Sequence, residues 1–182
     1  MVERRSVSLD MEVVSEPREV EIPGLELPTL SYDDLAVGAR FRSTGRTITE
    51  GDVTAFAGLS GDYNLLHTDA EYCRNTSFGQ RIAHGLLVLS VTSGLTARLS
   101  LMKAMEPSIL GLVDLQCSWT HPTFIGDTIH VIATITELTP SRRPDRGIVV
   151  LDRAAVNQRG EEVMNSRWKL LVRRRQEAGA AK

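Results

Sequence analysis

Residues 83–102 read AHGLLVLSVTSGLTARLSLM, and this stretch decides the fold. It predicts a helix with leucine, valine and methionine on nearly every side, so other elements have to bury it. Small side chains cluster on one side of that helix at helical spacing, where a backbone, a sheet or a ligand can come close. These small residues are Ser90, Ser93, Gly94 and Ala97.

The last third of the chain supplies the structure that wraps this helix. Four runs rich in valine, isoleucine, leucine and threonine predict strands over 109–120, 128–138, 147–157 and 162–173. Proline, glycine and aspartate turn signals separate the runs, so consecutive strands are expected to be antiparallel. Long antiparallel strands around one central helix predict a single α+β domain. An open sheet leaves an edge to cover, which favours a homodimer or a higher homo-oligomer.

The composition divides the chain into one domain with two tails. Residues 1–30 are expected to form an extended arm, because prolines interrupt an acidic and apolar pattern that has no regular period. The folded domain is expected over 31–175, and residues 176–182 form a flexible C-terminal tail. The chain end before that tail is basic, so a contact between it and the acidic arm is conceivable, with two solvated tails as the alternative.

Local signals predict the elements that precede the buried helix. A strand pattern covers 40–49, and Thr49 lies three positions before Asp52 in the approximate spacing of a helix capping box. Gly61 is well placed to end the helix that follows. The next expected elements are a turn over 62–68 and a short helix that Asp69 opens.

Charge and cysteine usage exclude several classes of protein. The formal net charge of −2 provides no strong basic field for a nucleic acid. The longest uncharged stretch, 82–97, is shorter than the roughly 20 residues of a membrane-spanning helix. Cys73 and Cys117 form no CxxC pair, which is typical of a reduced protein without a disulfide framework. No segment resembles a targeting sequence, and we therefore expect a cytoplasmic protein.

The densest polar cluster is SGDYNLLHTD over 60–69. Asp62 and His67 lie five positions apart, so a carboxylate and an imidazole could hold one water between them and move protons near neutral pH. Aspartate and asparagine are also common turn residues, and a lone histidine often has only a structural hydrogen bond. The cluster by itself leaves both interpretations open.

A second cluster, RIAHGL over 81–86, leads into the buried helix. The first N–H groups of a helix lack internal partners, and Gly85 would let a ligand carbonyl approach them closely. This is the arrangement of an oxyanion hole. The alternative is that Gly85 permits tight packing and that His84 satisfies the helix end.

Three motifs in order resemble one known family. The runs FAGLSGDYNLLH over 56–67 and FGQRIAHGL over 78–86 resemble the hydratase-2 motif and the central-helix start of the MaoC-like (R)-specific enoyl-CoA hydratases and dehydratases. The run PTFIGDT over 122–128 resembles the strand-turn-strand sequence of that family. The resemblance covers roughly residues 32–173 and implies the hot-dog fold, in which an antiparallel sheet wraps one long helix and protomers pair edge to edge.

The resemblance also implies roles for individual residues. Asp62 and His67 would be the catalytic pair that activates water, and the Gly85 N–H would polarise the thioester carbonyl. Asn64 would brace the catalytic turn. The remaining residues of the implied oxyanion and substrate-binding set are Ser93, for which packing is an equal alternative, and His84.

One residue departs from the family pattern. The family usually has proline directly after the asparagine, and this chain has Leu65, which should loosen the turn without removing a reacting group. No metal or redox cofactor is implied, because the four histidines lack zinc-ligand spacing and no Gly-rich phosphate loop is present. Coenzyme A is expected as part of the substrate.

The implied reaction is hydration of a trans-2-enoyl-CoA to an (R)-3-hydroxyacyl-CoA, or its reverse. Two other functions fit the same fold: a hot-dog acyl-CoA thioesterase and a noncatalytic acyl-CoA-binding subunit. The order Gly-Asp-x-Asn-x-x-His argues against a thioesterase, and the presence of both Asp62 and His67 argues against a noncatalytic subunit.

Overall fold

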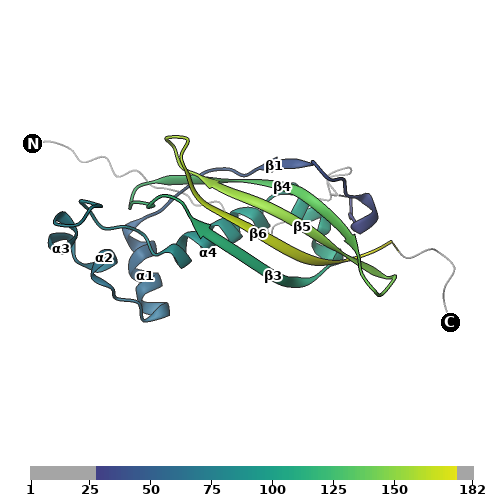
Figure 1. Ribbon diagram of the computed structural model, residues 1–182, viewed down its shortest axis with the longest axis horizontal. Helices are drawn as coiled ribbons and strands as arrows, with labels where there is room; N and C mark the ends of the chain where they lie inside the picture. The colour runs from purple at the N-terminus through teal and green to yellow at the C-terminus, as the bar shows by residue number, and fades with distance from the viewer. Residues whose placement is uncertain (1–27, 176–182) are drawn as a thin grey trace, which may run out of the picture.

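The computed structural model describes residues 28–175, which form a twisted antiparallel sheet around a central helix (Figure 1). The expected arm up to residue 27 and the tail over 176–182 lie outside the described residues. The helices are η1 (Tyr32–Asp34), α1 (Glu50–Ser60), α2 (Leu65–Thr68), α3 (Ala70–Arg74), α4 (Gly85–Ala97), α5 (Ser100–Met105) and η2 (Glu106–Ser108). The strands are β1 (Arg40–Arg42), β2 (Arg46–Thr47), β3 (Ile109–Trp119), β4 (Thr128–Pro140), β5 (Arg146–Val156) and β6 (Glu162–Arg173).

The sheet has the order β1-β4-β5-β6-β3, with β2 paired to the start of β4. The helix α4 lies behind the sheet in Figure 1, and α1, α2 and α3 gather at one end of it. Buried side chains of α4 and the inner faces of the strands form one core, which includes Leu95, Val131 and Leu151. The predicted α+β hot-dog architecture is confirmed, and the four long strands agree with prediction to within two residues at each end.

The strand predicted over 40–49 is wrong, because the chain forms two short strands there. The Ser43 hydroxyl, in place of a backbone carbonyl, accepts a hydrogen bond from the Val131 amide at 2.9 Å. Between β1 and β2, a polar side chain thus takes the place of a backbone acceptor in the pairing with β4.

The helix predicted over 83–102 is also two helices. The chain bends by 71° between α4 and the segment Ser100–Ser108. Leu99 at the break is extended, with ψ 143°, and it is buried as are Leu101 and Met105. The bend turns these apolar side chains into the core, which a straight helix would not do. Among the described helices none alone is long and apolar enough to cross a membrane, and only this bent pair together reaches that length.

A buried arginine ties α4 to the sheet. Arg153 on β5 is 2% exposed and donates hydrogen bonds to Thr96 on α4 at 2.9 Å and to Ser166 on β6 at 2.8 Å. Its guanidinium carbon lies 3.5 Å from the centre of the Trp168 ring. Burial lowers the pKa of Arg153 to about 9, which is still well above neutral pH. The side chain therefore stays charged and retains these contacts.

The chain end packs against the start of the domain. Arg174 binds Asp33 with its closest oxygen at 2.5 Å, and Arg175 forms an ion pair with Asp34. The hydrogen bond from Arg174 holds the pKa of the Asp33 carboxyl below its usual range. The basic chain end thus pairs with the first helical turn of the described chain, η1.

Candidate active site

The first site segment begins where α1 ends. The predicted capping box is present, with the Thr49 side chain accepting from the Asp52 amide and the Asp52 carboxylate accepting from the Thr49 amide. The helix ends at Gly61, whose φ of 76° lies in the left-handed region that glycine adopts without strain. This reversal places Asp62 directly after the helix, with an exposed side chain.

The turn predicted over 62–68 contains a short helix, α2. Asn64 caps it, because its side-chain oxygen accepts from the Leu66 amide at 3.0 Å. Leu65 occupies the first helical position, where a proline would fit. The Asn64 cap therefore closes the turn with Leu65 in the place of the family's proline.

The hydrogen bonds of His67 determine which ring nitrogen is free. Its Nδ1 lies 2.8 Å from the carbonyl oxygen of Ile82. A carbonyl can only accept, so Nδ1 carries the proton and Nε2 of the neutral ring keeps its lone pair. His67 is therefore oriented by backbone with a basic nitrogen left for other partners.

His84 stacks on His67 and supports the turn over 62–68. The two ring centroids are 3.8 Å apart, and His84 Nε2 donates to the carbonyl oxygen of Asp62 at 2.9 Å. His84 is 2% exposed, and its side chain makes no capping bond to α4, so the predicted alternative that it satisfies the helix end is wrong. The polar atoms of Asp62, His67 and His84 lie within 4.8 Å of one another.

Gly85 opens α4 beside this cluster. Among the described residues its amide has no acceptor, as is normal in the first turn of a helix. A Cβ built on Gly85 would lie 2.9 Å from the Trp119 ring, and Trp119 Nε1 donates to the Gly85 carbonyl at 2.9 Å. Tight packing against Trp119 and an amide without an acceptor therefore coexist at Gly85.

Backbone hydrogen bonds join the three sequence motifs. The Ile82 amide donates to the Leu66 carbonyl at 3.1 Å, and the next amide, of Ala83, donates to Thr123 at 2.8 Å. Ile82 also forms an isolated β-bridge with Phe124. The start of α4 is thus held between the histidine turn and the 122–128 loop, and Gly85 and His67 line the same cavity.

A buried carboxylate shapes the 122–128 loop. Asp127 is 3% exposed and accepts from the Phe124 amide at 2.9 Å and from Arg159 at 2.7 Å. Burial raises the pKa of Asp127, but the bonds from Arg159 and Phe124 outweigh it and lower the pKa below its usual value. The charged form of Asp127 therefore fixes the loop that supports α4.

A cavity of about 350 Å³ lies in front of His67 and Gly85. Its described lining is largely apolar, as expected for a site that takes an acyl group. The lining residues are His67, Phe78, Ile82, Ala83, Gly85, Val88, Trp119, Thr120, His121, Pro122 and Thr123. Ser93 lies further along α4 and does not line this cavity.

Trp119 lines the cavity, although no sequence motif singled it out. It is 45% exposed and donates a hydrogen bond to the Gly85 carbonyl. The only signal was its position at the end of a strand, just before the PTFIGDT motif. Nothing in that position indicates that the strand end reaches the start of α4.

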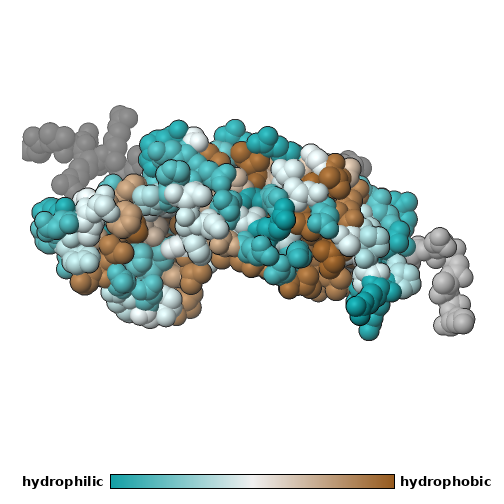
Figure 2. Space-filling view, viewed as in Figure 1, coloured by the Kyte–Doolittle hydropathy of each residue, from teal (hydrophilic) through white to brown (hydrophobic). Residues whose placement is uncertain are grey.

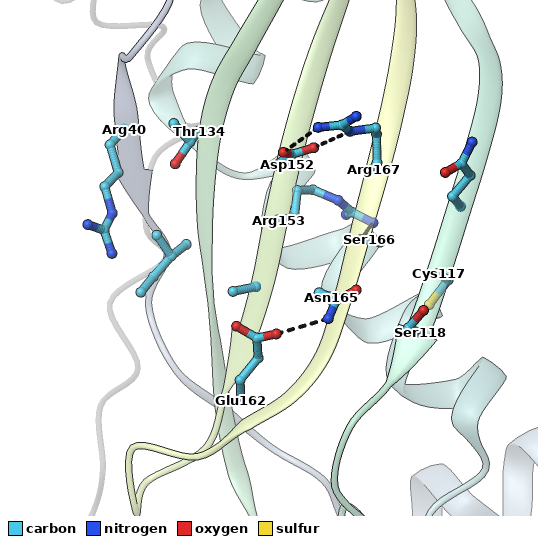
Figure 3. A pocket seen from close by; sticks show the side chains of 13 residues that line it. Arg40, Cys117, Ser118, Thr134, Asp152, Arg153, Glu162, Asn165, Ser166 and Arg167 are labelled. Atoms are coloured by element: carbon cyan, nitrogen blue, oxygen red, sulfur yellow. Dashed lines mark hydrogen bonds and ion pairs between the residues drawn. The ribbon is translucent and has the colours of Figure 1, made fainter.

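A second hollow, of about 470 Å³, lies on the outer face of the sheet (Figure 3). Two of its charged side chains pair with each other, because Arg167 binds both oxygens of Asp152 at 2.7 and 2.8 Å. Arg153 and Ser166 belong to the same strands but bind each other on the helix side. None of the predicted site residues lines this hollow, so the cavity at Gly85 is the candidate active site.

Known proteins share this arrangement. Residues 35–156 match the family model of the MaoC like domain. The chain is 33% identical over 121 residues to a 3-hydroxybutyryl-CoA dehydratase of Methylorubrum extorquens, covering 66% of this chain and 73% of that one. It is 32% identical over 131 residues to an (R)-specific enoyl-CoA hydratase of Aeromonas caviae, covering 72% and 90%.

A solved structure agrees with the sequence relatives. The crystal structure of the MaoC-like dehydratase from Rhodospirillum rubrum superposes with a TM-score of 0.73 at 38% identity, covering 81% of this chain and 99% of that one. The fold, the motif order and these likenesses lead to one conclusion: the chain belongs to the MaoC-like domain family and is a hydratase or dehydratase, an enzyme of the lyase class.

Proposed function

We propose that the protein adds water to a trans-2-enoyl-CoA to form an (R)-3-hydroxyacyl-CoA, and that it catalyses the reverse dehydration. The observation that carries the proposal is His67, which lines the cavity together with Gly85, keeps Nε2 free and lies close to the Asp62 carboxylate just outside the cavity lining. Asp62 and His67 together can accept a proton from a water molecule, and the Gly85 N–H can donate a hydrogen bond to a thioester oxygen. Relatives with (R)-specific enoyl-CoA hydratase activity support the substrate class.

The reaction follows from where these groups lie. A water between Asp62 and His67 donates its hydrogen bonds to the carboxylate and to Nε2. As its oxygen attacks the β-carbon, one proton passes to this pair, and the α-carbon then receives one proton from it. Negative charge moves onto the thioester oxygen, where the Gly85 N–H and the positive end of the α4 dipole stabilise it. One water on one face of the double bond yields syn addition.

An assay of a thioester panel tests the proposal. Enoyl- and 3-hydroxyacyl-CoAs of varied length, branching and carboxylation are mixed with the protein in buffer that contains a chelator, since no metal or cofactor takes part in the proposed chemistry. Loss of conjugated-enoyl absorbance without release of free thiol is expected. Thiol release without hydration would identify a thioesterase, and tight binding with neither reaction would identify a noncatalytic subunit.

The sheet edge next to the site predicts a homodimer. β3 has a neighbour on one side only, and it carries exposed apolar side chains, over which Figure 2 shows a hydrophobic area. These residues are Leu110, Leu112, Val113, Leu115 and Trp119, between 37% and 56% exposed. An unpaired apolar edge of this length is a template for a second copy of the chain.

Light scattering at micromolar concentration should give twice the 20.1 kDa protomer mass. Leu115→Lys, which places a charge on that edge, should shift the protein toward monomers, whereas Val37→Lys at an exposed position before β1 should not. A monomeric wild-type protein with full activity would contradict the dimer.

A further inference from the structure

We propose that arginines at the far end of the sheet of one protomer bind the phosphates of the coenzyme A carrier whose acyl group lies in the partner's active site. The inference rests on the proposed function and on the β3 dimer. It assigns a role to the most concentrated positive charge of the described chain, around the β4–β5 turn and the end of β6.

The symmetry of a dimer formed through β3 decides which ends of the two protomers lie side by side. A strand that pairs with its own copy about a twofold axis must run antiparallel to it. The end of β3 at Trp119, which lines the catalytic cavity, therefore lies beside the partner chain's opposite end. Each active site faces the end of the partner that carries Arg173.

The register of β3 shows which residues of the two protomers would lie opposite each other. Bulges interrupt its pairing with β6 before Asp114, and the regular part runs from Asp114 to Trp119. If this regular part pairs with itself, Trp119 lies opposite the partner's Asp114, whose own neighbour on β6 is Lys169. The partner's Arg173 then lies four residues further along β6, about 13 Å in the strand direction and one strand further from the interface. In the proposed arrangement, the carrier leaves the cavity in the direction of this arginine.

The far end offers positive charge that is not neutralised. Arg142 and Arg143 in the β4–β5 turn and Arg173 at the end of β6 are exposed, and no carboxylate among the described residues forms an ion pair with them. Arg146 and Arg174 lie beside them, paired with aspartates. Figure 2 shows strongly hydrophilic side chains at this end of the molecule, where Figure 1 places the turn. Guanidinium groups in such a cluster match phosphate oxygens well.

Four arginines near the active site are engaged differently. Each has a carboxylate partner within 2.8 Å: Arg46 with Asp52, Arg74 with Glu71, Arg81 with Glu50, and Arg159 with Asp127. These ion pairs hold the site's loops together. The described residues of one protomer therefore provide a place for the acyl thioester but no unpaired arginine beside it for a polyphosphate, and the partner's far end provides three.

Binding of coenzyme A itself tests the proposal independently of catalysis. Calorimetric titration should give a Kd for coenzyme A that rises about ten- to hundredfold in the variant Arg142→Gln/Arg143→Gln/Arg173→Gln. The Kd for pantetheine, which lacks the nucleotide phosphates, should not change. The matched control Arg40→Gln/Arg42→Gln removes exposed arginines from β1, the opposite edge of the sheet, and should leave both values unchanged.

A mixed dimer shows whether the arginines act across the interface. One chain carries Asp62→Asn, and the other, differently tagged chain carries the three far-end substitutions. Only the chain with the three substitutions then has an intact Asp62, and its partner has intact arginines. The KM of this active site for an enoyl-CoA should therefore equal that of the wild type, whereas the homodimer of the triple variant should have a raised KM. A raised KM in the mixed dimer would overturn the action across the interface.

The outcomes separate this inference from the proposed function. Loss of coenzyme A affinity in the triple variant without hydration by the wild type would reject the hydratase proposal and keep the phosphate site. Normal hydration with unchanged coenzyme A affinity in the triple variant would reject the phosphate site and keep the hydratase proposal. Equal losses in the triple variant and the β1 control would show only a general effect of net charge and reject the site.

Discussion

Asp62→Asn is expected to lower kcat/KM for hydration of an enoyl-CoA by about a thousandfold, and His67→Ala by a similar factor. The first change keeps the size of the side chain but removes the base, and the second removes the nitrogen that faces the same water. Neither side chain is buried in the core, so the melting temperature should change little. Because the two residues act on one water, the double variant should be little worse than the worse single variant.

A nearby carboxylate provides the matched control for this prediction. Asp69 lies two positions after His67 and accepts a capping hydrogen bond from the Tyr72 amide at 2.9 Å. Asparagine caps helices about as well as aspartate, so Asp69→Asn makes the same chemical change nearby without touching the reacting groups. It should keep nearly full activity. Coenzyme A affinity should survive in all these variants, and full hydration by Asp62→Asn would refute the mechanism.

Gly85→Pro is expected to lower kcat by about a hundred- to thousandfold relative to Gly85→Ala. Proline removes the N–H that would bind the thioester oxygen, yet it suits the first position of a helix. The preceding residue, His84, already has the extended conformation, φ −60° and ψ 135°, that a following proline requires. The helix should therefore still form without its oxyanion donor.

The alanine variant separates the two roles of Gly85. Its Cβ would lie 2.9 Å from Trp119 in the present structure, so Gly85→Ala should displace that ring and lower stability and activity while it keeps the N–H. Single-turnover kinetics and thermal melts of both variants distinguish the effects. If the proline variant were no slower than the alanine variant, the Gly85 amide would not be the oxyanion donor.

Local patterns were sufficient for much of this protein. Alternating β-branched residues and turn signals predicted the four long strands, and the capping box at Thr49 with Gly61 predicted both ends of α1. These features depend on neighbours along the chain, which sequence contains. The same holds for the order of Asp62, Asn64 and His67, which indicated the chemistry before any geometry was known.

Other features depend on contacts that no local pattern encodes. The helix over 83–102 bends at Leu99 because the core on the far side of the break buries the next apolar residues, and the strand over 40–49 breaks where a Ser43 hydroxyl meets β4. In both places a tertiary contact outweighs the helical or strand preference of the segment itself.

The active site shows the same division most clearly. The sequence by itself supplied the candidate residues Asp62, His67 and Gly85, and their proposed roles came from the resemblance of the surrounding motifs to one family, because a carboxylate and an imidazole in a turn also fit a structural role. Only the tertiary structure decided that His67 keeps Nε2 free, since its other nitrogen is bound by the Ile82 carbonyl from a separate motif. It also decided that Trp119, 34 residues away, packs on Gly85. Tautomer and packing depend on partners distant in sequence, and those partners become neighbours only when the sheet wraps the helix.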